Sequence, residues 1–284
     1  MIVACIQMNP VIGDKPTNVS RSADLIRSAA ERGVDLVVLP ELANTGYVFR
    51  DRQEALDLAE KVPGGETTAV WSELASRHQT TIVAGIAERD GDNLFNSAVM
   101  VGPKGYIGRF RKVHLWGDEK KIFEPGDLGF PVYQAPFGRV AIAICYDVWF
   151  PETFRAAAVQ QADILCVPTN WVPMPGQPAD RPAMANTLVM AGAHSNNLVV
   201  ACADRVGVER GQPFEGQSLI VDRRGWPIAG PASRLDEEIL FAQVDLDPSS
   251  RRGVGADNDV LQDRRPDVYA GIAYLVPDSV KSTP

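Results

Sequence analysis

The stretch that most constrains this chain runs from Gly138 to Glu152 and reads GRVAIAICYDVWFPE. Residues 140–146 are apolar, small or aromatic, which predicts a strand buried on both faces. An aspartate and a proline then break the strand, and residues 152–161 follow as a helix, so Cys145 lies at a sharp strand-to-helix junction. Unpaired N–H groups and the helix dipole there lower the pKa of a thiol and offer donors to an oxyanion. The alternative is that Cys145 is a small hydrophobic residue of the core.

Strands and helices alternate along the rest of the chain. We expect strands at 2–7, 34–39, 81–86, 96–101, 164–168, 198–203 and 238–244, helices at 18–32, 67–78 and 181–196, and hairpins turned at 102–105 and within 217–228. Helices that alternate with buried strands and hairpins indicate a layered α/β protein with mixed sheets. A tail rich in Pro, Arg and Asp begins near residue 248.

The composition is that of a globular domain with one large core, because 45% of the 284 residues are hydrophobic and 23% are charged. The net charge is −8 and no basic cluster is interleaved with aromatic residues, which argues against nucleic acid or an anionic membrane surface as a partner. Four scattered cysteines in apolar strands favour reduced thiols and a cytoplasmic location. The start, MIVACIQMNP, is interpreted as a first strand and not a signal peptide, and no apolar stretch approaches the length of a membrane span.

Two more polar residues stand at the ends of predicted strands. Glu41 follows Pro40, which takes the chain out of the sheet at the edge where α/β sites form. Lys112 ends the second strand of the 96–111 hairpin. Alone, these side chains are ordinary surface charges. With Cys145 they suit cleavage of a C–N bond: the thiolate attacks a carbonyl carbon, Glu41 moves the proton to the leaving amine, and Lys112 stabilises the oxyanion and lowers the pKa of the thiol.

Three motifs around these residues, VLPELANTGY, GRFRKVHLW and AICYDVWFPE, resemble the nitrilase or carbon-nitrogen hydrolase superfamily with its Glu-Lys-Cys triad. GGETT, NLFNSAVMVGPKG, EKKIFEPGD and NDVLQDRRPDVY add to the resemblance, which covers about residues 2 to 270. It implies a four-layer α-β-β-α sandwich over residues 1–262, a homodimer or higher homo-oligomer, and a C-terminal tail, 263–284, that packs on the partner. It also implies that Glu119 is a second glutamate of the site and that the Tyr146 N–H is an oxyanion donor.

The residues after the nucleophile indicate the branch of the superfamily. True nitrilases typically read Cys-Trp-Glu, whereas this chain has Cys-Tyr-Asp, which resembles the amide- and carbamoyl-hydrolysing branches. EKKIFEPGDLGFPVY resembles N-carbamoyl-D-amino-acid amidohydrolases, but Val148 and Trp149 stand where those enzymes carry two carboxylate-binding arginines. CYDVWFPE is closer to N-carbamoylputrescine amidases. An uncharged or amine-bearing substrate is therefore favoured, although Arg205 or Arg210 could supply a carboxylate partner from elsewhere.

Several aromatic and polar residues are candidates for the pocket. Trp149 and Trp171 could form an aromatic wall for an apolar or cationic group, or they could pack in the core or in a dimer interface. Tyr47, Asn170 and Tyr146 are the other substrate-binding candidates.

Other functions have less support. Hydrolysis of a small nitrile and of an N-carbamoyl amino acid are the enzyme alternatives, and a non-catalytic binding module of the same fold is the alternative outside enzymes. Serine-amidase and GxSxG segments are absent from the sequence, as are the GxxxxGK[ST] and GxGxxG patterns. The histidines at 78, 114 and 194 are too isolated for ligand spacing. We therefore expect no metal and no cofactor.

Overall fold

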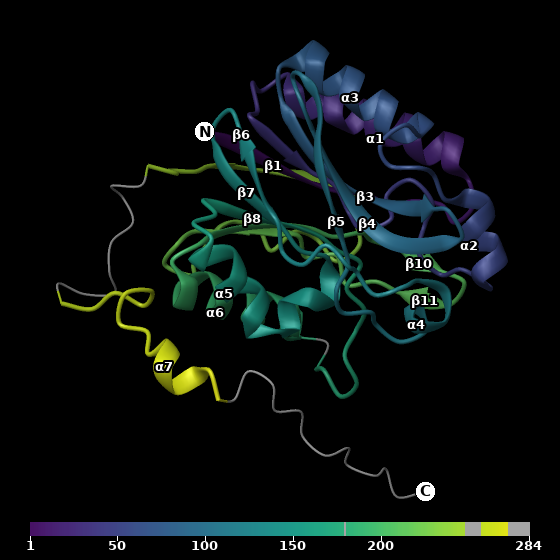
Figure 1. Cartoon of the computed structure of the whole chain (residues 1–284). Coiled ribbons are helices and arrows are strands. Elements are labelled where there is room, and N and C mark those ends of the chain that lie inside the picture. Colours follow the sequence, from purple (N-terminus) through teal and green to yellow (C-terminus); the bar gives the residue numbers. More distant parts are fainter. Residues whose placement is uncertain (179, 248–256, 272–284) are drawn as a thin grey trace, which may run out of the picture.

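The computed structural model describes residues 1–178, 180–247 and 257–271. Two six-stranded mixed sheets pack face to face, with helices on both outer faces (Figure 1). The predicted four-layer α-β-β-α sandwich is confirmed. The predicted packing of the tail on a partner concerns residues 263–284, most of which lie outside the described residues, and it stays a prediction.

The first sheet has the strand order β14-β1-β2-β3-β4-β5. In chain order its strands are β1 (Ile2–Gln7), β2 (Leu36–Val38), β3 (Thr81–Asp90), β4 (Asn93–Gly102), β5 (Gly105–Arg111) and β14 (Glu238–Gln243). The central strands β1, β2 and β3 are parallel, whereas β4, β5 and β14 add antiparallel edges. Alternate residues of a strand point to opposite faces, so Val3 and Cys5 pack toward the second sheet while Ala4 and Ile6 pack under the helices.

The second sheet has the strand order β13-β12-β9-β8-β7-β6. Its strands are β6 (Val132–Ala135), β7 (Gly138–Ile142), β8 (Ile164–Pro168), β9 (Val199–Ala203), β12 (Leu219–Val221) and β13 (Pro227–Ala229). The centre, β7-β8-β9, is parallel. Because parallel strands in one sheet end at the same edge, the loops after β7 and β8 emerge side by side.

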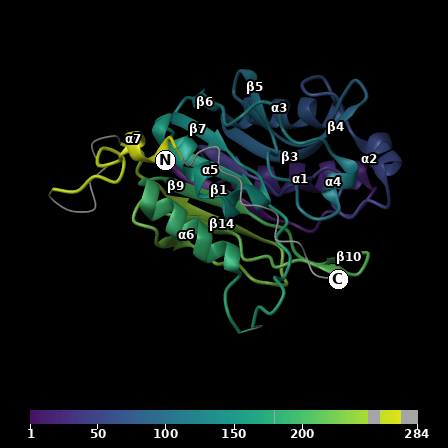
Figure 2. The ribbon, with the colours of Figure 1, turned by 60° about the horizontal axis from the view of Figure 1, so that its bottom comes forward.

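The helices cover the outer faces. Helices α1 (Lys15–Ala30) and α3 (Glu66–His78) lie on the first sheet, and α5 (Pro151–Val159) and α6 (Met184–Asn196) lie next to each other on the second (Figures 1 and 2). Short elements complete the described chain: α2 (Arg52–Leu58), α4 (Glu119–Ile122), the 3₁₀ helix η1 (Cys145–Trp149), β10 (Val208–Glu209), β11 (Gln212–Pro213) and α7 (Pro266–Tyr269). Across the described ranges, none of these helices has both the length and the apolar character that a bilayer span needs.

Several predicted boundaries are wrong, each for a local reason. The strand before the cysteine ends at Ile142 and not at Tyr146, because Cys145 has φ +47°, a left-handed conformation that a strand cannot contain. Helix α1 starts three residues before its predicted start at 18, because the Asp14 carboxylate accepts from the Thr17 N–H and caps it there. Helix α6 starts at Met184 and not at 181, and the Ala183 N–H donates to Gln217. The predicted hairpin around 102–105 is confirmed as β4 and β5.

Candidate active site

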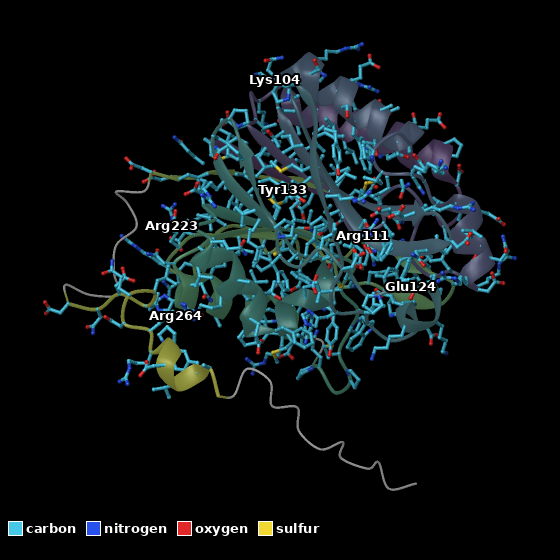
Figure 3. All side chains as sticks on the ribbon, viewed as in Figure 1. Lys104, Arg111, Glu124, Tyr133, Arg223 and Arg264 are labelled. Atoms are coloured by element: carbon cyan, nitrogen blue, oxygen red, sulfur yellow. The ribbon has the colours of Figure 1, made fainter. Side chains whose placement is uncertain are left out.

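Lys112 is the centre of a buried charge cluster. Lys112 directly follows Arg111, the last residue of β5. In Figure 3, Arg111 lies near the middle of the molecule, whereas Lys104, in the turn before β5, lies at its edge. The Lys112 Nζ atom lies 2.7 Å from Oε1 of Glu41 and 2.7 Å from Oε1 of Glu119. Burial acts to lower the pKa of Lys112, but the charges of Glu119 and Glu41 outweigh it and raise that pKa. The ammonium therefore stays charged although it is removed from water.

Glu41 leaves the end of β2 through Pro40, as the sequence predicted, and is fully buried. Its Oε1 atom accepts from Lys112 and, at 2.6 Å, from Asn96 Nδ2, whereas Oε2 has no hydrogen-bond partner among the described residues. Burial raises the pKa of Glu41 to about 7, and the nearby Lys112 limits the rise. A buried carboxylate with one free oxygen and a pKa near neutrality can accept a proton.

Cys145 is the first residue of η1, and its side chain belongs to the same site, because Glu41, Lys112 and Glu119 all perturb the thiol. Its left-handed backbone is a strained conformation for a residue with a Cβ and turns the side chain out of the strand direction. The expected lowering of the thiol pKa is wrong. Burial and the charge of Glu41 raise the pKa of Cys145, and Lys112 offsets them only in part. The thiol is thus neutral until a base removes its proton.

Glu119, at the start of α4, is held by three donors. Its Oε1 atom accepts from Lys112 and from the Tyr47 hydroxyl at 2.5 Å, and its Oε2 atom accepts from the Trp116 N–H at 3.1 Å. Burial raises the pKa of Tyr47, and the negative charge of Glu119 adds to that rise, so the hydroxyl keeps its proton and donates it. Tyr47 was predicted to contact substrate; its hydroxyl donates to Glu119, and a substrate contact of its ring stays a prediction.

A narrow cavity opens beside Cys145. Its other lining residues are Trp116, Tyr146, Trp149, Asn170, Trp171, Val172 and Met174. It therefore gathers four of the predicted substrate-binding residues with the thiol, while Tyr47 lines an adjoining hollow that shares Trp116 and Val172. No charged side chain is among these lining residues. Asn170 also donates from Nδ2 to the Glu41 carbonyl oxygen at 2.9 Å, which ties the loop after β8 to the loop after β2.

The two arginines that could have bound a carboxylate point elsewhere. Arg205 is buried and forms an ion pair with Glu209, with 2.7 Å between Nη1 and Oε2. Arg210 forms an ion pair with Glu54, also at 2.7 Å. Neither lines the cavity beside the thiol, so the alternative source of a carboxylate partner is not present there.

Comparison with known proteins agrees with this geometry. The family model for carbon-nitrogen hydrolase matches residues 2–250. The chain belongs to this family. A protein named nitrilase from Pyrococcus abyssi is 43% identical over 267 residues, which cover 94% of this chain and 98% of that one. N-carbamoylputrescine amidase from Solanum lycopersicum is 33% identical over 92% of this chain and 91% of its own.

A solved structure extends the likeness to three dimensions. It is of a mutant amidase from Nesterenkonia sp. AN1 that carries the acetamide moiety of fluoroacetamide on its active-site cysteine. That chain is 26% identical, with a TM-score of 0.80, over 97% of this chain and 97% of its own. A structure of an amidase from Nesterenkonia sp. aligns with a TM-score of 0.81 at 26% identity over 96% of both chains. The predicted membership of the carbon-nitrogen hydrolases is confirmed.

In this carbon-nitrogen hydrolase, sequence reasoning missed several residues around the thiol. Trp116, Val172 and Met174 line the cavity, and the only signal for Trp116 was its place as the last residue of the lysine motif GRFRKVHLW. Asp147 was interpreted as a strand breaker, yet it is fully buried and accepts hydrogen bonds from the backbone N–H groups of His114 and Ile144. Among the described residues, no three His, Cys, Asp or Glu side chains are arranged as ligands of a metal ion.

Proposed function

We propose that this protein hydrolyses the C–N bond of a small amide or N-carbamoyl compound through a thioester on Cys145. The observation that carries the proposal is the ammonium of Lys112, 2.7 Å from both Glu41 and Glu119, in the same site as the thiol. A neutral thiol, a base with a pKa of about 7 and a permanent cation are the groups that acyl transfer needs.

The reaction follows from the positions of these groups. Glu41 accepts the thiol proton on its free Oε2 as the sulfur bonds to the carbonyl carbon. Lys112 Nζ and the Tyr146 N–H stabilise the oxyanion. Glu41 then gives the proton to the leaving nitrogen, and the C–N bond breaks to release ammonia or an amine. In the second half, water gives its proton to Glu41 and attacks the thioester, which releases the acid and restores the thiol.

The cavity supports an uncharged or amine-bearing substrate. Its walls are aromatic, apolar or amide side chains, and Arg205 and Arg210 are engaged in ion pairs outside it. A substrate carboxylate would enter without a partner, which is costly in a buried site. Aromatic faces, in contrast, favour apolar and cationic groups. An N-carbamoyl amine or a neutral amide therefore fits better than an N-carbamoyl amino acid.

Nitrile hydrolysis is the second candidate, because the Pyrococcus abyssi relative is named a nitrilase. The thiol would add to the nitrile carbon, and two waters would convert the adduct to a carboxylic acid and ammonia. The experiment is ammonia release from amide, ureido and nitrile panels matched in their side group, with Cys145→Ala as the blank. Turnover of amides or ureido compounds supports the first proposal and turnover of nitriles alone supports the second. Turnover of none of them in a folded protein would favour the binding module.

Mass spectrometry of the quenched reaction identifies the substrate class independently. We expect the peptide that contains Cys145 to gain the mass of the acyl group less one hydrogen, the hydrogen that the acyl group replaces on the sulfur. An adduct on Cys5, Cys166 or Cys202 instead would contradict the assignment. We also propose a homodimer, on the family resemblance alone, and sedimentation of the full chain tests it.

A further inference from the structure

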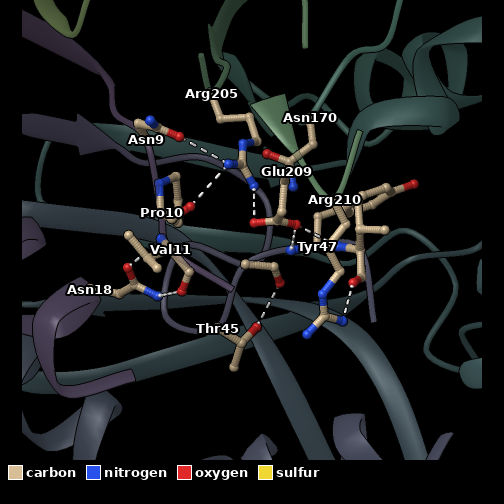
Figure 4. A network of polar contacts seen from close by, with 12 residues as sticks. Asn9, Pro10, Val11, Asn18, Thr45, Tyr47, Asn170, Arg205, Glu209 and Arg210 are labelled. Atoms are coloured by element: carbon tan, nitrogen blue, oxygen red, sulfur yellow. Dashed lines mark hydrogen bonds and ion pairs between the residues drawn. The ribbon is translucent and has the colours of Figure 1, made fainter. Parts of the chain in front are cut away.

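A buried ion pair between Arg205 and Glu209 lies outside the cavity that Cys145 lines. Arg205 follows β9 and Glu209 ends β10, and both side chains are buried. Figure 4 shows the ion pair between them and the contacts that Arg205 makes with Asn9 and Pro10. Besides its contact with Glu209, Arg205 donates from Nη2 to Asn9 Oδ1 at 3.0 Å and to the Pro10 carbonyl oxygen at 2.9 Å. Its guanidinium also lies 4.1 Å from the ring centre of Phe214. Arg205 is thus fixed from several directions and in turn fixes Glu209.

The second oxygen of Glu209 faces the loop that carries Tyr47. Glu209 Oε1 accepts from the backbone N–H groups of Tyr47 and Val48, at 2.7 Å and 2.6 Å. The approach is tight, because a Cβ on Gly46 would lie 2.7 Å from Oε2 of Glu209, and Gly46 has φ +81°. The Tyr47 ring also makes an edge contact with Phe214, with 5.9 Å between ring centres. The main chain at Tyr47 is therefore set by this carboxylate.

From Tyr47 the contacts lead directly to the charge cluster. The Tyr47 hydroxyl donates to Glu119 Oε1, the same atom that accepts from Lys112 Nζ. A buried ion pair is weak evidence for stability, since desolvation of the two charges offsets their attraction. The ion pair between Arg205 and Glu209 is nevertheless connected to the site, because Glu209 accepts from the Tyr47 N–H and the Tyr47 hydroxyl donates to Glu119. The position of Glu209 therefore affects a hydrogen bond of the charge cluster.

We propose that Glu209, held by Arg205, is a positioning residue that sets the Tyr47 hydroxyl on Glu119 and so fixes Lys112 for oxyanion stabilisation. The inference rests on the proposed function of Lys112. Glu209 touches neither the cavity nor the thiol. It therefore acts through Tyr47. If so, the effects of substituting Glu209 and Tyr47 on kcat should not add in the double variant.

The test is a double-mutant cycle of Glu209→Gln and Tyr47→Phe, assayed by steady-state kinetics on the substrate found above. Each single variant is expected to lower kcat roughly tenfold with KM unchanged, the effect of losing one hydrogen bond to a charged group. In the Tyr47→Phe background, Glu209→Gln should lower kcat no further. An equal loss of kcat in both backgrounds would overturn the inference, because a general structural defect acts with or without the hydroxyl.

Alkylation of Cys145 by iodoacetamide as a function of pH gives a readout that does not depend on turnover. We expect both single variants to shift the midpoint of this profile equally and the double variant to shift it no further. An unchanged profile in folded variants overturns the inference even if the wild type is an amidase. Failure of the wild type to hydrolyse any panel compound would instead remove the proposed function and leave this measurement valid.

Two further variants separate positioning from folding. Glu209→Gln leaves Arg205 as a buried cation without its partner, and this variant can fail to fold for that reason. In that case the double variant Arg205→Gln with Glu209→Gln, which removes both charges, replaces Glu209→Gln in the cycle. Glu54→Gln is the matched control, because it breaks the Arg210 ion pair beside the same loop without touching the Tyr47 N–H. It is expected to leave kcat and the alkylation profile unchanged. A Glu54→Gln variant with the same losses as Glu209→Gln would overturn the inference.

Discussion

The Nδ1 atom of His114 lies 2.7 Å from Oδ1 of Asp147, and the backbone N–H of His114 donates to the same oxygen at 3.0 Å. The other oxygen, Oδ2, accepts from the Ile144 N–H at 2.9 Å. His114 comes two residues after Lys112, and Ile144 comes just before Cys145. One buried carboxylate therefore sets the spacing between the segment that carries the ammonium and the segment that carries the thiol.

Asp147→Asn tests this link. The amide can accept through only one of its two terminal atoms, so its NH₂ group must face either the His114 N–H or the Ile144 N–H. We expect the free energy of unfolding to fall by about 1–3 kcal/mol and kcat to fall with it, measured by urea denaturation and by ammonia release. Asp118→Asn is the control, because Asp118 lies in the same loop between β5 and α4 as His114, and 84% of its side chain is exposed. A folded Asp147→Asn variant with wild-type kcat would show that the spacing does not depend on this carboxylate.

The acid limb of the pH profile should report Glu41. In the proposed mechanism only the ionised carboxylate accepts the thiol proton. Its pKa is raised from 4.5 to about 7, so kcat/KM should fall as pH drops through about 7. The same shift means that the folded protein binds this proton more tightly than the unfolded chain. Stability from this group is therefore fully present below about 4.5 and is lost as pH rises to about 7.

Glu41→Gln provides the matching measurement. The amide cannot take the proton, so we expect hydrolysis to fall at least a hundredfold at every pH and the loss of stability between about pH 4.5 and 7 to flatten. Activity of the wild type that stays constant from pH 8 to 5 would exclude Glu41 as the base.

The sequence carried much of the fold because its signals were local. Buried runs such as residues 164–168, predicted and observed as β8, can only pair inside a sheet, and Pro40 takes the chain out of its sheet at the point where Glu41 stands. Cys145, Glu41 and Lys112 were predicted to meet on the same reasoning and on the resemblance to a family. Their pKa shifts were not predictable in the same way, because the sign for Cys145 depends on burial and on two carboxylates whose distances come only from the folded chain.

Asp147 shows the same limit from the other side. In the sequence an aspartate after an apolar run reads as a turn residue, and only the tertiary contacts with His114 and Ile144 show that it is a buried acceptor. Tyr47 likewise has an aromatic ring suited to a pocket, and its bond to Glu119 depends on a loop held by Glu209 from another part of the chain.

The four thiols should differ in their reactivity with iodoacetamide because of their access to the reagent and not because of their pKa values. Burial raises the pKa of Cys5, Cys166 and Cys202 as it does that of Cys145, but only Cys145 lines the cavity. We expect iodoacetamide to modify Cys145 first and the other three only on unfolding, as followed by peptide mass mapping. Cys145→Ala should abolish hydrolysis and leave the melting curve near that of the wild type. A folded Cys145→Ala variant that still releases ammonia would exclude the thioester mechanism.

Gly85 of β3 determines how closely that strand can approach the segment that carries Glu41. A Cβ on Gly85 would lie 2.5 Å from the Pro40 carbonyl oxygen and closer still to the Cα of Glu41, and these are backbone atoms that cannot rotate away. The main chains are also joined, since the Gly85 N–H donates to the Pro40 carbonyl at 3.0 Å. Gly85→Ala must therefore move the base away from the strand.

We expect Gly85→Ala to destabilise the fold by about 1–3 kcal/mol, the usual range for overpacking, and to lower kcat by more than this stability loss explains, because the proposed base is displaced relative to the thiol. The measurements are urea denaturation and kcat under conditions in which the variant is fully folded. Gly102→Ala is the matched control in the same sheet: the atom nearest to its Cβ would be Cδ1 of Ile107, at 2.8 Å, which is the movable end of a side chain, and the other neighbours would lie at ordinary contact distances. A loss of kcat in Gly85→Ala but not in Gly102→Ala would tie the rate to the position of the Glu41 main chain. If both variants kept wild-type kcat per folded molecule, the placement of Glu41 would not depend on this close approach.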